Sequence, residues 1–182
     1  MVKTDINLFA EGEVVYTDGG VLAEFAWVLV VLPFIAALII TFAGKSLPLK
    51  GAEIALGTIG IIFIYSLALM YLHVTEGVAN EFFINVGNIG QFDIEFGWVV
   101  DGLSIMMYFV VGLVALLVFI YATNYMEGEI RYTFFFTSLT LFAGSMLVLV
   151  SSPTLIQILI GWELVGVCSY LLIGHYWEVK DN

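Results

Sequence analysis

Glu163 is the residue in this sequence best suited to proton chemistry. It lies nine residues into an apolar run that extends from about Thr154 to Trp177, and this places it about 14 Å along a helix. A carboxyl group at such a depth in a membrane costs a few kcal/mol to insert, so acidic residues there usually face a bundle interior or water and mark proton or ion paths. We therefore interpret Glu163 as a proton-binding group. A structural acid that hydrogen-bonds to a neighbouring helix is the alternative.

Three residues at helical spacing share a face with Glu163. Gly166, Val167 and Tyr170 follow it by three, four and seven residues, so they offer the carboxyl group a gap, an apolar patch and a phenol. In the preceding apolar run, Thr140 and Thr137 could face the same cavity and bind water. Alternatively, these two hydroxyl groups bond to the backbone of their own helix in a tightly packed pair.

His175 is a further candidate, because it follows Glu163 by twelve residues and lies near the end of the same run. It could pass protons from the water on that side, or it could be an aromatic residue at the membrane interface. The other histidine, His73, falls at the opposite side, and Cys168 is the only cysteine. The sequence therefore predicts no metal site.

No cation accompanies Glu163 in these runs, because none of them contains a lysine or arginine in its interior. A working proton relay needs a second group, which must come from another chain or from sequence beyond residue 182. We find no phosphate loop, nucleotide fingerprint or nucleophile triad. Asp101 precedes another run, where helix capping and the helix dipole explain an acid.

The composition indicates that the helices which position these residues lie in a lipid bilayer. Hydrophobic residues make up 62% of the chain and charged residues 12%, whereas an ordinary globular domain is about 45–50% apolar. The formal net charge is −11, which together with the lack of a basic stripe excludes nucleic acid as a partner. The first twenty residues are acidic and lack the basic start of a secretory signal, so we expect the first apolar run to be retained as an anchor in the lipid bilayer.

Five apolar runs are long enough to cross a bilayer. A soluble helical bundle would need polar outer faces at helical spacing, and these are missing. Pro33 lies inside the first run, where we expect a kink. The prediction is an all-α integral membrane protein in which residues 1–182 form a single membrane domain of about five transmembrane helices, at about 21–43, 52–74, 103–125, 132–151 and 154–177.

The segment between the second and third runs has a different pattern. Residues 75–100 mix acidic residues with asparagine and glycine, and two short apolar pieces, Phe82–Val86 and Phe92–Phe96, flank the sequence Gly-Asn-Ile-Gly. Such a pattern is typical of a small β-hairpin at the membrane surface.

The few cations predict how the chain crosses the membrane. If the helices alternate in direction, Lys45, Lys50, Arg131 and Lys180 fall on one side and only Lys3 falls on the other. Cytoplasmic loops carry the excess of lysine and arginine. We therefore expect the amino terminus and the hairpin outside and residue 182 inside.

The run at 159–174, Leu-Ile-Gly-Trp-Glu-Leu-Val-Gly-Val-Cys-Ser-Tyr-Leu-Leu-Ile-Gly, closely resembles the fifth-helix signature of chain 5, or subunit L, the largest antiporter-like membrane subunit of respiratory complex I. The stretches at 100–104 (Val-Asp-Gly-Leu-Ser) and 143–150 (Ala-Gly-Ser-Met-Leu-Val-Leu-Val) are also similar to that family. The resemblance extends from about 97 to 177. Leu164 replaces a common glycine, as in photosynthetic relatives, and His175 replaces a common aromatic residue.

The resemblance implies that Glu163 is the essential fifth-helix glutamate, which pairs with a lysine on a later helix and helps to move protons. It implies a proton-translocating subunit of an NADH:quinone oxidoreductase in a bacterial plasma membrane or an organellar inner membrane. It also implies no cofactor in this chain, with flavin, iron–sulfur clusters and quinone on other subunits. The expected partners are other membrane subunits of complex I, especially a neighbouring antiporter-like subunit. Family members have many more helices, so the chain reads as an amino-terminal fragment.

Two other functions are compatible with the residues. A subunit of a multi-subunit sodium/proton antiporter or of a membrane-bound hydrogenase would share Glu163 but would lack the link to quinone chemistry. A structural membrane subunit would pack in a complex and transport nothing.

Overall fold

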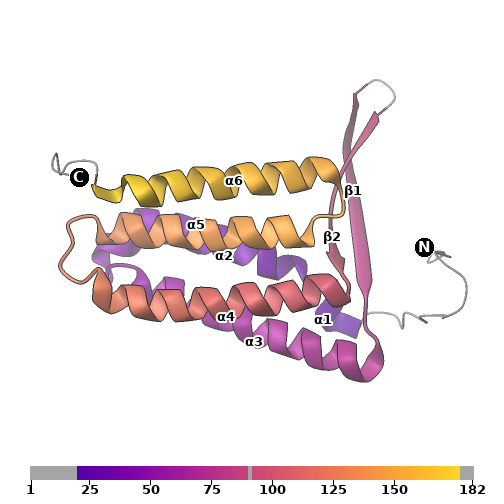
Figure 1. The fold of residues 1–182 in the computed structure, drawn as a ribbon, viewed down its shortest axis with the longest axis horizontal. Coiled ribbons are helices and arrows are strands. Elements are labelled where there is room, and N and C mark those ends of the chain that lie inside the picture. The colour runs from indigo at the N-terminus through magenta and orange to yellow at the C-terminus, as the bar shows by residue number, and fades with distance from the viewer. Residues whose placement is uncertain (1–19, 90–91, 177–182) are drawn as a thin grey trace, which may run out of the picture.

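Five long helices form the chain, with a β-hairpin between the second and the third of them (Figure 1). The computed structural model describes residues 20–89 and 92–176. All five helices are long and apolar enough to cross a membrane, which confirms the predicted all-α membrane fold. They are α2 (Trp27–Ala43), α3 (Ala52–Glu76), α4 (Gly102–Tyr125), α5 (Tyr132–Ser151) and α6 (Leu155–Ile173).

The first apolar run is not one helix. We predicted a continuous helix over about 21–43, but the structure has a short helix, α1 (Gly20–Glu24), before α2 starts at Trp27. Between them the amide of Ala26 donates to the carbonyl of Ala23 at 3.3 Å. A bond over three residues is the tighter 3₁₀ pattern, and it interrupts the α-helical bonding at this point.

Pro33, where we expected a kink, lies inside α2 without ending it. It is buried against α5: a Cβ atom on Gly144 would come within 3.0 Å of the Cβ atom of Pro33 and 3.2 Å of the Phe34 ring. The small residue therefore lets the backbone of α5 approach α2 closely, a common way of packing helices in membranes.

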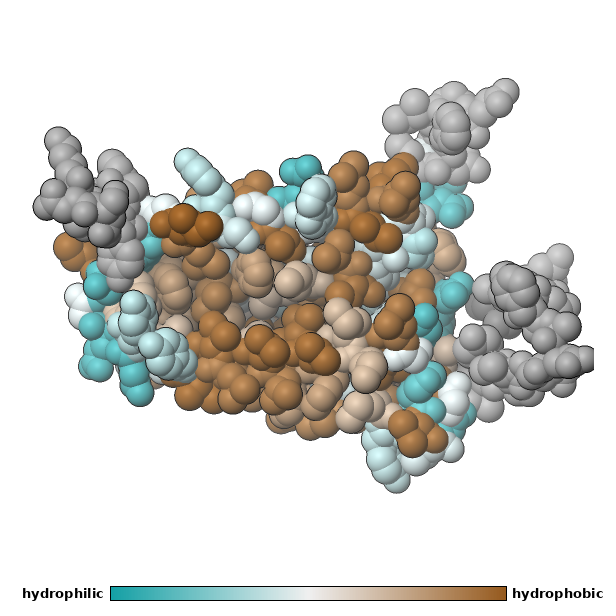
Figure 2. Space-filling view, viewed as in Figure 1, coloured by the Kyte–Doolittle hydropathy of each residue, from teal (hydrophilic) through white to brown (hydrophobic). Residues whose placement is uncertain are grey.

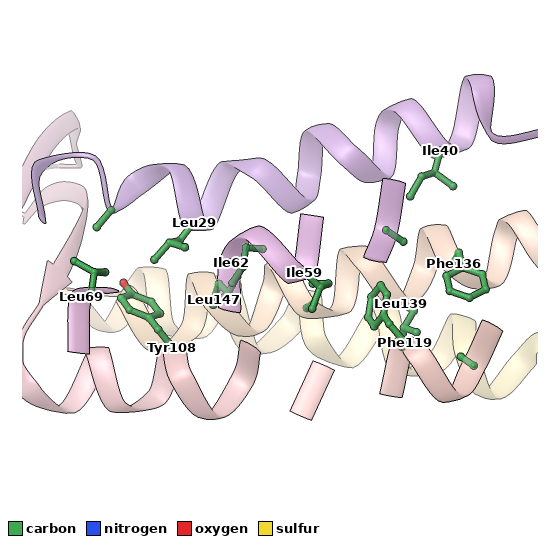
Figure 3. Close-up of a cluster of buried hydrophobic side chains, with 14 of the residues drawn as sticks. Leu29, Ile40, Ile59, Ile62, Leu69, Tyr108, Phe119, Phe136, Leu139 and Leu147 are labelled. Atoms are coloured by element: carbon green, nitrogen blue, oxygen red, sulfur yellow. The ribbon is translucent and has the colours of Figure 1, made fainter. Parts of the chain in front are cut away.

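The core lies among α2, α3, α4 and α5. Figure 3 shows large buried side chains from these four helices meeting between them, including Leu29, Ile62, Tyr108 and Phe136. The outward faces are also apolar, and Figure 2 shows hydrophobic residues across the middle of the molecule with hydrophilic residues towards its two ends. A band of apolar surface with polar ends suits a bilayer. The remaining helix, α6, packs on α5 at the margin of the bundle (Figure 1).

The predicted β-hairpin is confirmed, with strands longer than the two apolar pieces. Strand β1 (Asn80–Ile89) pairs antiparallel with β2 (Phe92–Val100), and a bulge lies between Asn85 and Gly87. The hairpin crosses the ends of the helices and extends past α6 (Figure 1). The rings of Phe82 and Trp98 stack across the strands at 4.4 Å.

Both ends of the hairpin are tied to the helices that flank it. At the end of α3, His73 Nδ1 lies 2.7 Å from the carbonyl oxygen of Val78. At the start of α4, the carboxylate of Asp101 accepts a hydrogen bond from the amide of Ser104 at 2.7 Å. This bond is the helix cap that the sequence predicted for Asp101. His73 therefore ties the segment before β1 to the end of α3, and Asp101 caps α4 directly after β2.

Candidate functional site on α6

Glu163 is the ninth of the nineteen residues of α6, close to the middle of the helix. Its side chain is exposed, as are Gly166 and Tyr170, and Tyr170 has an exposed fraction of 76%. The spacing of three and seven residues puts these residues on one helix face. The structure thus brings together the carboxyl group, the gap and the phenol that the sequence suggested.

This face points away from the bundle because α6 packs on α5 with its opposite face. A Cβ atom on Gly161 would lie 3.0 Å from the backbone of Leu149. Farther along α6, Cys168 is buried, with its Sγ atom 3.9 Å from the Oγ atom of Ser145. Since Glu163 lies about 200° around the helix from Gly161 at 100° per residue, its carboxyl group is directed outward.

The surroundings of Glu163 are apolar. Leu159 and Val167, one turn before and after it, are exposed on the same face. Within helices α2 to α6 the structure places no lysine or arginine. A carboxyl group at mid-span needs a polar or charged neighbour, so this face of α6 is suited to contact a further helix.

Thr140 is not beside Glu163. It is fully buried (0% exposed), and its hydroxyl donates to the carbonyl of Phe136 at 2.7 Å. Thr137 donates in the same way to Thr133 at 3.0 Å. Gly144, one turn from Thr140 on the same face, packs against α2. The structure therefore matches the alternative in which these hydroxyl groups bond within their own helix.

His175 lies beyond α6, in the short 3₁₀ helix η2 (Gly174–Tyr176), and it is turned towards α5. Its side chain is only 6% exposed, and its ring meets the ring of Phe135 edge to face at 5.6 Å. Burial lowers the pKa of His175; Glu129 opposes this shift, and Arg131 adds to it. The structure thus separates His175 from the exposed face that carries Glu163.

The lowered pKa of His175 predicts a pH-dependent stability. The unfolded chain takes up a proton near the ordinary pKa of about 6.5, whereas the folded chain resists it. Stability should therefore fall as the pH drops below about 6.5 and level off below the folded pKa. In His175→Phe this part of the decline should disappear, as measured by the thermal midpoint in detergent between about pH 7.5 and 5. Parallel curves for the two proteins would contradict the assignment.

Gln157 and Thr154 are residues of the site that sequence reasoning missed. The Gln157 side chain is 7% exposed and bonds to both backbone groups of Gly97 in β2: its Oε1 atom accepts from the amide at 2.9 Å, and its Nε2 atom donates to the carbonyl at 2.8 Å. The hydroxyl of Thr154 donates to the carbonyl of Glu95 at 3.1 Å. A glutamine inside an apolar run was the available signal, because a buried amide needs partners.

Comparison with known proteins agrees with the resemblance. The family described as NADH-ubiquinone oxidoreductase (complex I), chain 5 N-terminus, matches residues 87–136, from the hairpin into α5. Chain 5 of NAD(P)H-quinone oxidoreductase from Synechocystis is 38% identical over 166 residues, which cover 87% of this chain and 24% of that protein.

Two further relatives give the same result. Chain 5 from Picosynechococcus is 38% identical and the chloroplastic subunit 5 of Chlorokybus atmophyticus is also 38% identical, with 87% and 86% of this chain covered and 25% of each relative. The chain thus spans about a quarter of the length of the curated relatives it matches. The chain is thus similar to chain 5 of complex I over most of its own length, and the matching family model describes the amino-terminal part of that subunit.

Proposed function

We propose that this chain is part of a proton-translocating membrane subunit of an NAD(P)H:quinone oxidoreductase, in which Glu163 binds and releases the transported proton. The similarity to chain 5 proteins supports the enzyme complex. The observation that carries the role of Glu163 is its place at the middle of α6 on an outward apolar face. Carboxyl groups at this depth mark proton paths.

The neighbours of Glu163 give it room to exchange a proton. Among the described residues, no atom beyond the backbone of α6 itself lies within 4 Å of the position that a Cβ atom on Gly166 would take, so water or a neighbouring helix can approach there. The exposed phenol of Tyr170 can hydrogen-bond to water on the same face. Glu163 therefore has a route for a proton along α6, and a basic group on a helix that covers this face would switch its protonation.

We assign the redox reaction to other subunits of the complex, where flavin, iron–sulfur clusters and quinone would bind. Among residues 20–89 and 92–176, no three histidine, cysteine, aspartate or glutamate side chains gather into a metal-binding group. The partners of this chain are other membrane subunits of the complex, especially a neighbouring antiporter-like subunit. Co-purification with NAD(P)H-oxidising subunits would distinguish this assembly from a sodium/proton antiporter.

We also propose an amino terminus outside and residue 182 inside a bacterial plasma membrane or an organellar inner membrane; the matched relatives include chloroplast proteins. Lys50 and Arg131 support this orientation, since the carbonyl of Lys50 accepts a hydrogen bond from Thr133, two residues after Arg131. Both cations thus lie at one end of the bundle. The predicted orientation also used Lys3 and Lys180. These two residues lie outside the described part of the chain.

Cysteine labelling tests the orientation. Val86 in the hairpin and Ile130 before α5 are both exposed, and they mark opposite ends of the bundle. In sealed right-side-out vesicles, an impermeant maleimide should label Val86→Cys directly and Ile130→Cys only after permeabilisation. The reverse pattern would show that the chain crosses the membrane in the opposite sense.

The function itself is tested by NAD(P)H-driven proton pumping in membranes that carry Glu163→Gln in the full-length subunit. Assembly of the complex is measured in the same membranes. Pumping that stays normal would identify the chain as membrane scaffold.

A further inference from the structure

The helix that carries Glu163 is the least enclosed of the five. Within the described structure, the buried residues of α6 are Gln157, Gly161 and Cys168. Gly161 and Cys168 touch α5, whereas Gln157 reaches the hairpin. Glycine and cysteine contacts allow close approach but provide little directional bonding. Although α6 packs along α5, the polar contacts at its amino-terminal end are the directional ones, so they are best placed to fix the rotation of α6 about its own axis.

The strongest of these contacts is a pair of hydrogen bonds that we call the Gln157 clamp. The side-chain amide of Gln157 accepts from the amide of Gly97 at 2.9 Å and donates to the carbonyl of Gly97 at 2.8 Å. Both bonds are buried. Two bonds from one planar amide fix direction as well as distance, so the clamp sets the rotation of α6 against β2.

Gly97 allows β2 to bind Gln157 while β2 remains paired with β1. A Cβ atom at this position would collide with the backbone carbonyl of Phe82 in β1. The strands are therefore too close here for any side chain, and the peptide groups of Gly97 are left accessible to Gln157.

Thr154 fixes the position of α6 along its axis. Its hydroxyl donates to the carbonyl of Glu95 at 3.1 Å and accepts from the amide of Gln157 at 3.4 Å. The same side chain thus caps α6 and binds the hairpin. Together with the Gln157 clamp, it ties the first turn of α6 to two alternate residues of β2, Glu95 and Gly97.

We propose that Gln157 is a positioning residue for Glu163: the Gln157 clamp holds α6 in the rotation that directs the carboxyl group away from α5. The two residues are six positions apart in one rigid helix. Because the helix is rigid, a rotation about its axis turns Glu163 through the same angle as Gln157. This inference rests on the proposed role of Glu163 in proton transfer.

Cys168 provides a built-in reporter of this rotation. It is the only cysteine of the chain, and it is buried against Ser145 on the face of α6 that meets α5. Eleven residues separate it from Gln157, which is close to three full helical turns, so both lie on the same side of α6. If the clamp is lost and α6 turns, Cys168 should become exposed as Glu163 moves.

The experiment replaces Gln157 with methionine in the full-length subunit of the assembled complex. Methionine has a similar length and flexibility but cannot form the two hydrogen bonds. Three properties are measured: the rate of proton pumping, its pH profile, and the alkylation of Cys168 by a permeant maleimide, followed on the labelled peptide by mass spectrometry. Gln157→Glu, which keeps the acceptor for the Gly97 amide, serves as a second variant if the first does not assemble.

Ser169→Ala is the matched control. Ser169 lies six residues after Glu163, as Gln157 lies six before it, and its hydroxyl bonds only within α6, to the carbonyl of Val165 at 2.8 Å. We expect Gln157→Met to lower pumping by about tenfold or more, displace the pH profile, and speed the alkylation of Cys168. Ser169→Ala should behave as the wild type in all three measurements.

Other outcomes overturn the inference. Faster alkylation with normal pumping would show that the rotation of α6 does not matter for the proton step. Unchanged alkylation, whether pumping falls or not, would show that the clamp does not hold α6 in place. Normal pumping by Glu163→Gln would instead refute the proposed function, and this variant is assayed in parallel to keep the two failures distinct.

Discussion

Replacing Glu163 with glutamine is expected to reduce NAD(P)H-driven proton pumping through this subunit by about 100-fold or more, while the complex still assembles. Glutamine has nearly the same shape but cannot bind and release a proton at neutral pH. The Glu163 side chain is exposed on α6, so this replacement of nearly the same shape leaves the packing of the described helices in place. The expected loss is therefore one of proton transfer. Pumping is measured as acidification of sealed vesicles, normalised to assembled complex.

Two further variants make this result specific. Glu24→Gln removes an exposed carboxylate from α1, outside the long helices, and should leave pumping unchanged. Glu163→Asp keeps a carboxyl group but withdraws it by one methylene, so it should retain part of the activity. If Glu163→Gln pumps at the wild-type rate in an assembled complex, the proton-binding role of Glu163 is refuted.

Replacing Gly97 with alanine should prevent the hairpin from holding its native form. The added methyl group would collide with the Phe82 carbonyl and would lie 3.2 Å from the Cα atom of Phe83. Because the colliding atoms belong to the backbone, the strands must separate, at a cost of about 3 kcal/mol or more. Separation would also displace the peptide groups that bind Gln157. We expect a large loss of assembled complex, measured by native electrophoresis of membranes.

Gly87→Ala is the matched control in the same hairpin. In the part of the chain that the structure describes, no atom apart from its chain neighbours lies within 4 Å of the position that a Cβ atom on Gly87 would take. The same chemical change should therefore leave the amount of assembled complex close to that of the wild type. Equal losses in both variants would show that the hairpin tolerates no alanine for a reason other than the close approach at Gly97.

Local properties of the chain could be predicted without the structure. Five apolar runs required five spanning helices, because crossing the hydrocarbon core needs a minimum apolar length whatever the neighbours are. The Asp101 cap and the hairpin were also predictable, since both depend on residues close in sequence. The break at Ala26 was not, because no glycine or proline lies there and the single acid before it, Glu24, does not by itself end a helix.

The placement of Thr140 and Glu163 needed the tertiary structure. Helical spacing shows which residues share a face, but it does not say which neighbour that face meets. In a soluble bundle the apolar face marks the inside. In a membrane helix the lipid-facing side is apolar too, so this signal is lost, and small residues such as Gly161 and Gly144 decide the contacts.

By itself, the sequence determined that the chain has five segments long and apolar enough to span a membrane, that a hairpin joins the second and third of them, and that a carboxyl group lies near the middle of the fifth. Only the tertiary structure decided that this carboxyl group faces away from α5, that Thr140 lies apart from it, and that Gln157 ties its helix to Gly97. The first set follows from length and local polarity along one segment. The second depends on close approaches between different segments, such as Gln157 and Gly97, which are 60 residues apart in the chain, and no local pattern encodes them.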